Sequence, residues 1–150
     1  MAVAIDTVLV PVDGTDEAEL AVEYAVVVAQ RYDASIHVLH VLDETVARGV
    51  RRGDIEADSV ADEHRAFMRT VHEEIKNADG EVPVSQSTVR GFSSTQLSQH
   101  PVSVVLDAAE EMEADLIVVP RESISGTPGA MLGKVAQYVL SYASQPVLSV

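Results

Sequence analysis

Five short apolar runs alternate with segments of helical periodicity along the chain. The runs cover residues 7–12, 35–42, 82–89, 116–119 and 146–150. Short apolar runs bounded by turn residues are typical of strands. The first and fourth runs are continuously apolar, as expected of central strands that are covered on both faces. The third run has more polar residues and a proline near its start, which favours a position at the edge of a sheet.

The segments between these runs have the periodicity of helices. We expect helices from Asp16 onward and over residues 55–77, 102–113 and 130–143. The first would carry a narrow seam of small residues that permits close packing on a sheet, namely Ala18, Ala21, Ala25 and Ala29. The second would be long and acidic, with its apolar residues on one side, namely Val60, Phe67, Val71 and Ile75. Strands that alternate with helices specify an α/β fold with a parallel sheet and right-handed crossovers.

Length and composition indicate one domain, residues 1–150, with a substantial core. The chain has no cysteine, which excludes disulfides, thiolate metal sites and cysteine nucleophiles. Its first residues do not form a signal peptide, and no apolar stretch approaches the roughly 18 residues of a membrane span. We therefore expect a cytoplasmic location.

The charge balance narrows the choice of partners. The formal net charge is -14, from 24 acidic and 10 basic residues, and Lys76 and Lys134 are the two lysines. A field of this sign repels phosphate backbones and anionic lipid, so we expect neither nucleic-acid binding nor membrane binding. An acidic, lysine-poor surface suits a salt-rich cytoplasm, in which self-repulsion is screened within a few Å. The alternative to this halophilic interpretation is an ordinary acidic cytosolic protein.

The histidines and serines do not suggest a catalytic or metal site. His37 and His40 are three residues apart on an expected strand, so they should point to opposite faces. We expect His64 and His72 on the solvated side of the acidic helix. The serine-rich residues 93–98 have no evident base beside them and are interpreted as a hydrophilic loop.

Three stretches of the chain are similar, in the same order, to a known family. They are residues 8–15 (VLVPVDGT), residues 114–119 (ADLIVV), and residues 133–136 (GKVA) followed by QPVL at 145–148. Together they span nearly the whole chain. In these residues the sequence resembles the universal stress proteins of the UspA type.

The resemblance implies a five-stranded parallel sheet with flanking helices, of the Rossmann-like or flavodoxin-like kind. It also implies a homodimer that pairs through the last strand. The function that it implies is a stress-response or regulatory binding module, and we expect it to be non-catalytic. Two alternatives stay open: an ATP-binding member with slow hydrolysis, and a regulatory partner of a transporter or enzyme, whose identity the sequence does not give.

ATP-binding members of this family carry a Gly-x2-Gly-x9-Gly-Ser/Thr motif after the fourth strand. Its four positions fall here on Pro120, Ser123, Gly133 and Lys134. Only Gly133 matches. Proline has no amide hydrogen and a fixed φ, so the close approach that glycine permits is lost at Pro120. Lys134 replaces the hydroxyl with an ammonium, which reaches an anion only as a point charge.

Two further positions favour a nucleotide site. Asp13 matches the acidic residue that contacts the nucleoside in binding members, and Val41 falls near the backbone segment that meets the adenine. A helix after Gly133 would add unpaired amides. The structural alternative is that Asp13 caps a turn, Val41 belongs to the core, and Gly133 permits helix packing. We therefore assign no obligatory cofactor, and the candidate ligand is ATP or another nucleotide bound by a degenerate site.

The residues from Phe92 to His100 look like an insertion relative to the family pattern. They follow the third strand at its carboxyl end, on the side of the sheet where the nucleotide site is expected. Such a segment would cover the site, regulate it or contact a partner. The alternative is a tolerated surface insertion.

Overall fold

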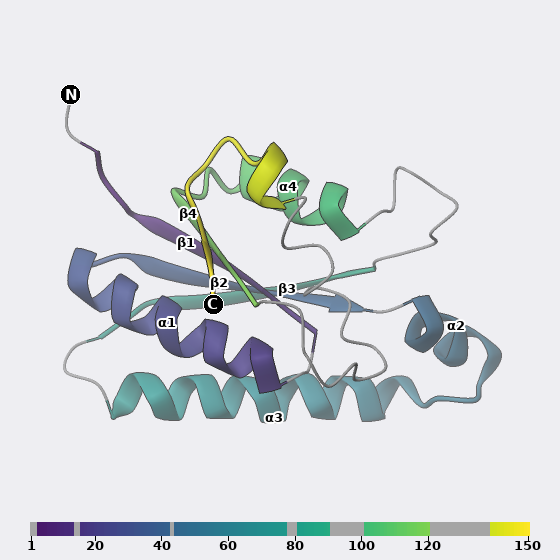
Figure 1. The fold of residues 1–150 in the computed structure, drawn as a ribbon. Coiled ribbons are helices and arrows are strands. Elements are labelled where there is room, and N and C mark those ends of the chain that lie inside the picture. Colours follow the sequence, from purple (N-terminus) through teal and green to yellow (C-terminus); the bar gives the residue numbers. More distant parts are fainter. Residues whose placement is uncertain (1–2, 14–15, 43, 78–80, 91–100, 121–138) are drawn as a thin grey trace.

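The computed structural model describes residues 3–13, 16–42, 44–77, 81–90, 101–120 and 139–150. They form one five-stranded parallel sheet with helices on both faces (Figure 1). The strands are β1 (Thr7–Val12), β2 (Ser35–Leu42), β3 (Val84–Arg90), β4 (Leu116–Val119) and β5 (Val147–Ser149). The predicted fold class is therefore confirmed.

The strand order is β3-β2-β1-β4-β5, which places β1 at the centre and β3 and β5 at the two edges. β1 and β4 are buried along most or all of their length, whereas most side chains of β3 are exposed. The prediction of two central strands and a polar third strand at an edge is confirmed. β1 and β4 are continuously apolar because each is covered on both faces, whereas an edge strand such as β3 tolerates polar residues.

The described helices are α1 (Asp16–Tyr32), α2 (Glu44–Arg52), α3 (Ala57–Lys76) and α4 (Pro101–Glu111). α1 and α3 lie on one face of the sheet, and α4 lies on the other together with a last helical turn at residues 139–142 (Figure 1). α2 was not predicted from the sequence. The rest of the helix expected over residues 130–143 lies outside the described residues.

Two hydrophobic cores, one on each face of the sheet, follow from the alternation of side chains along the strands. On the face of α1 and α3, even-numbered residues such as Val10 and Val38 meet the alanine seam of α1. All four seam alanines are fully buried, so small side chains bring the α1 backbone close to β1 and β4. On the other face, odd-numbered residues such as Leu9 and Ile117 meet α4.

The amino ends of β1 and β4 are tied together by one carboxylate. Asp115 Oδ2 accepts hydrogen bonds from the backbone N–H groups of Asp6, at 2.8 Å, and Thr7, at 3.0 Å. The backbone N–H of Asp115 donates in turn to the carbonyl of Thr7 at 2.8 Å. Asp115 therefore has a structural role, and it lies at the end of the sheet opposite to the carboxyl ends of the strands.

A glycine permits the close connection between α2 and α3. A side chain at Gly49 would have its Cβ 2.5 Å from Ile55 Cδ1, and the Gly49 carbonyl accepts hydrogen bonds from the N–H groups of Asp54 and Ile55. Gly53, just after α2, has a φ of 79°, in the left-handed region that glycine adopts without a steric penalty. These contacts fold the chain back sharply so that α3 can run along the sheet.

Candidate functional site

The strand order creates a switch point beside β1. The chain passes from β1 to β2 on one side, whereas β4 lies against the other side of β1. In open α/β sheets ligands bind in the crevice outside the carboxyl ends of the strands at such a point. Asp13 directly follows β1, Pro120 directly follows β4, and Val41 is the next-to-last residue of β2. The structure therefore brings these three candidate residues to the same end of the sheet.

Val41 can offer only its backbone to a ligand. Its side chain is 4% exposed and packs in the core on the α4 face, and its Cα pairs with that of Val89 on β3. The structural alternative, that this side chain belongs to the core, is thus confirmed. A main-chain contact to an adenine ring needs no more than a backbone amide and carbonyl at the strand end.

Asp13 is positioned by β1. It is partly buried and follows Val12, which is 1% exposed and anchored in the core. An ionised carboxylate accepts hydrogen bonds only, which suits the two hydroxyl donors of a ribose. The rigid strand therefore fixes the backbone from which the Asp13 side chain projects at the switch point.

Pro120 is the one position of the glycine motif that the structure describes. It is buried at the end of β4, next to Val119, which is 2% exposed. Proline donates no hydrogen bond, so this position cannot present an amide to a phosphate. Ser123, Gly133, Lys134 and the residues from Phe92 to His100, which include the serine cluster, lie outside the described residues.

One expectation about the histidines is wrong. His64 does not lie on the solvated side of α3, because its ring stacks on that of His40, with centroids 4.2 Å apart and planes inclined by 24°. His40 is 3% exposed and also meets the edge of Phe67 at 5.9 Å. The sequence held the missing signal: residue 64 is four residues after Val60 and three before Phe67, on the apolar side of the helix. His72 is exposed as expected.

Burial keeps this pair of rings uncharged. The pKa of His40 is lowered to about 4, mainly by desolvation and then by the proximity of His64 and, to a smaller extent, of His37, whereas the hydrogen bond with Gln86 acts in the opposite direction. Burial also lowers the pKa of His64, opposed by the charge of Glu63. The neutral His40 ring donates its Nε2–H to Gln86 Oε1 at 3.2 Å.

His37 lies on the opposite face of β2, as expected, and bridges two serines of β3. Its Nδ1 lies 2.6 Å from Ser85 Oγ and its Nε2 lies 2.7 Å from Ser87 Oγ. A neutral imidazole donates to one hydroxyl and accepts from the other. Both hydrogen-bond partners of the ring are hydroxyls, whereas the histidine of a catalytic serine–histidine pair is held by a carboxylate that stabilises the imidazolium. We interpret the three residues as a structural link between two strands.

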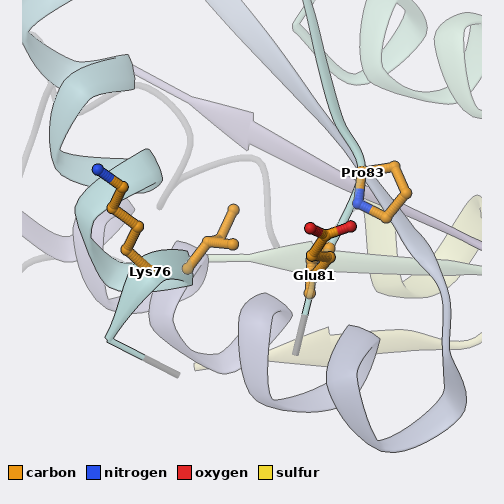
Figure 2. A pocket seen from close by; sticks show the side chains of 5 residues that line it. Lys76, Glu81 and Pro83 are labelled. Atoms are coloured by element: carbon orange, nitrogen blue, oxygen red, sulfur yellow. The ribbon is translucent and has the colours of Figure 1, made fainter. Parts of the chain in front are cut away.

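One cavity among the described residues lies away from the switch point. It has a volume of about 570 Å³ and is lined by Ile75, Lys76, Glu81, Val82 and Pro83. Figure 2 shows Lys76 at the end of α3, with its side chain directed away from Glu81 and Pro83, which lie on the segment that leads into β3. This is the amino end of β3, opposite to the end that carries Asp13 and Pro120. We assign the cavity no role in the candidate site.

In the part of the chain that the structure describes, no group of three or more histidine or acidic side chains is placed to hold a metal ion. No helix among the described residues is long and apolar enough to cross a membrane.

The sheet and its switch point define the class of the protein. It is a doubly wound α/β domain with one parallel sheet, and its candidate site lies at the carboxyl ends of β1, β2 and β4. The chain belongs to the universal stress protein family, whose family model matches residues 4–150.

Individual relatives agree with this assignment. Universal stress protein YxiE of Bacillus subtilis is 29% identical over 147 residues, which cover 95% of this chain and 96% of YxiE. The crystal structure of a universal stress protein in complex with cAMP is 25% identical, with a TM-score of 0.65, and the match covers 98% of this chain and 97% of that one. The universal stress protein from Archaeoglobus fulgidus in complex with dAMP shares the fold at 19% identity, with a TM-score of 0.61 and coverage of 99% and 98%.

Proposed function

We propose that this universal stress protein is a non-catalytic regulatory module that binds the base and sugar of an adenine nucleotide and holds its phosphates weakly. The observation that carries the proposal is Pro120, buried at the end of β4 where ATP-binding members of the family have glycine. The base and sugar half of the site, Asp13 and the backbone of Val41, is retained at the ends of β1 and β2. The site is thus degenerate in one half.

The neighbours and the charge of the chain support this division. The related structures hold cAMP and dAMP, which have a single phosphate each. A net charge of -14 disfavours the approach of ATP, which carries more negative charge than a monophosphate. Both arguments favour a nucleoside monophosphate over a triphosphate as the ligand.

The test is calorimetric titration of AMP, cAMP and Mg·ATP into the protein. We expect AMP or cAMP to bind at least about tenfold more tightly than ATP. The triple variant Pro120→Gly, Ser123→Gly, Lys134→Ser should raise the affinity for ATP about tenfold or more and leave that for AMP little changed. Asp13→Asn should weaken binding of every ligand. Tighter binding of ATP than of AMP by the natural sequence would contradict the proposal.

The two alternatives make different predictions. An ATP-binding member with slow hydrolysis would release inorganic phosphate from Mg·ATP, and Asp13→Asn would reduce the release. A regulatory partner of a transporter or enzyme would co-purify with that larger protein and bind no nucleotide. Proline at position 120, where ATP-binding members have glycine, argues against ATP hydrolysis. The acidic residue Asp13, which matches the nucleoside contact of binding members, argues against a protein that binds no nucleotide.

We further propose that the protein is a homodimer paired through β5. β5 is at the edge of the sheet, and its residues are half-buried. The N–H of Val150 bonds to the carbonyl of Val119 on β4, so the N–H of Ser149, one residue earlier, points to the open side. Light scattering should show a dimer for the natural sequence and for Ser149→Ala. Ser149→Pro, which removes the outward N–H, should weaken the dimer at least about tenfold. A monomer in all three would refute this pairing.

We also propose that the acidic surface adapts the protein to a salt-rich cytoplasm. A chain with 24 acidic and 10 basic residues is suited to a salt-rich cytoplasm, and we place the protein there. This part of the proposal is tested by the dependence of the melting temperature on the concentration of KCl.

A further inference from the structure

We propose that the histidine contact, formed by His40, His64 and Phe67, is a pH-sensitive attachment of the first half of α3 to the sheet. Protonation of the two imidazoles separates this half of the helix from β2 and β3. The inference concerns the fold itself and does not depend on the proposed nucleotide site.

The distribution of burial along α3 makes the contact important for its first half. The buried residues of the helix are Met68 and Val71, which both lie in its second half. In the first half, before residue 67, only Val60, Ala61 and His64 are even partly buried, and the other side chains are exposed. The stack of His64 on His40 is therefore a main attachment of this half to the sheet.

The surroundings of the two rings decide how they respond to protons. Among the described residues, the groups shown to act on His40 are His64 and Phe67 from α3 and Gln86 from β3, with His37 on the other face of its own strand. None of these can carry a negative charge, so an imidazolium at His40 would have no counter-ion among them. Glu63, beside His64, is the acidic group that acts on the pair, and it acts on His64. Two imidazolium rings stacked at 4.2 Å would repel each other inside the fold.

The size of the effect follows from proton linkage. Where the contact is closed, the pKa of His40 is about 4, and where it is open the ring returns to its ordinary value of 6.5. Acid therefore favours the open form. Between pH 7.5 and pH 5, His40 alone would increase the equilibrium constant for opening by about 30-fold. His64, whose pKa is also lowered, adds to this factor.

Hydrogen exchange of the whole protein at pH 7.5 and pH 5 tests the proposal, with rates corrected for the intrinsic effect of pH on exchange. We expect amides in the first half of α3 to lose protection by about 30-fold or more. Amides of β4 and α4 should lose much less. In His40→Phe, which keeps an aromatic ring but no titrating group, the loss in α3 should fall below about fivefold. His72→Phe, a matched change at an exposed position of the same helix, should behave like the natural sequence.

A second measurement covers the case in which His40→Phe does not fold. The imidazole signals of His40 and His64 in the natural protein can be followed by NMR as a function of pH. A pKa for His40 that stays more than one unit below 6.5 supports the proposal, and an ordinary pKa overturns it. Equal loss of protection in α3, β4 and α4 would also overturn it, because acid would then unfold the whole domain rather than release one half-helix.

Discussion

The two halves of α3 meet the rest of the molecule through opposite kinds of titrating group. In its first half His64 stacks on the buried ring of His40. In its second half Glu74 lies against Glu19 and Glu23 of α1, and we call these three residues the carboxylate cluster. We therefore expect acid to loosen the first half of this helix and base to loosen the second.

The carboxylate cluster places a partly buried acid among like charges. The pKa of Glu74 is raised to about 7, mainly by burial and then by the negative charges of Glu23 and Glu19. Glu74 Oε2 is buried without a hydrogen-bond partner among the described residues. The raised pKa thus rests on desolvation and repulsion more than on a hydrogen bond to Glu23.

The signs of the two effects follow from which state binds more protons. His40 has a lower pKa folded than unfolded, so the unfolded chain binds more protons and stability falls as the pH drops from 6.5 toward 4. Glu74 has a higher pKa folded than unfolded, so stability falls as the pH rises from 4.5 to 7. The two contributions oppose each other over the same range, and each masks part of the other in the natural protein.

The largest effect is expected from removing the buried histidine. Between pH 7.5 and pH 5, the free energy of unfolding of the natural protein should fall by about 2 kcal/mol more than that of His40→Phe. Urea unfolding at the two pH values measures this difference. His72→Phe serves as the control and should follow the natural protein. An unchanged pH dependence in His40→Phe would show that the first half of α3 does not respond to acid through this ring.

A smaller effect of opposite sign is expected from the carboxylate cluster. Glu74→Gln keeps the shape of the side chain and removes its charge, so at pH 8 it should stabilise the protein. After allowance for screening by solvent at this partly exposed position, the gain is about 1 kcal/mol. It should disappear near pH 4.5, where the carboxyl is protonated. The exposed neighbour Glu73→Gln should change little, and an equal gain there would indicate a general effect of net charge.

The smallest effect is expected from salt. At pH 8, about 2 M KCl should raise the melting temperature by a few degrees, because it screens the repulsion among 24 acidic residues. Glu74→Gln should gain less than the natural protein. Other salts at matched ionic strength separate screening from the general exclusion of salt from protein surfaces. A flat response to KCl would count against the halophilic interpretation and leave the pH comparison intact.

The sheet was predictable because its residues obey simple rules. The bounds of β1, β2 and β4 agree with the predicted runs, since continuous apolar segments have few other uses in a domain of this size. α2 was missed because it is short and largely polar, and because Gly49 and Gly53 suggest a turn more than a helix. Glycine is required at position 49 because Ile55 packs directly against it, and this contact forms only once the chain has folded back.

The candidate site was predictable in part. The position of Asp13, Val41 and Pro120 at one end of the sheet follows from the order of strands and helices. The histidine contact was not predicted, because the partner of His64 lies 24 residues earlier in the chain on a strand. Periodicity could place His64 on the apolar side of α3, but the identity of its neighbour depends on how α3 packs across the sheet.

The bridge from His37 to Ser85 and Ser87 also bears on how this protein avoids aggregation. Both hydroxyls are on one face of β3, so a shift of one residue in its pairing with β2 would turn them to the other face and break both contacts. The same strand exposes a polar edge, which is a poor template for another chain. The two edges of the sheet thus differ: the pairing of β3 is held in register by the bridge to His37, whereas β5 is the edge through which we propose that the homodimer pairs.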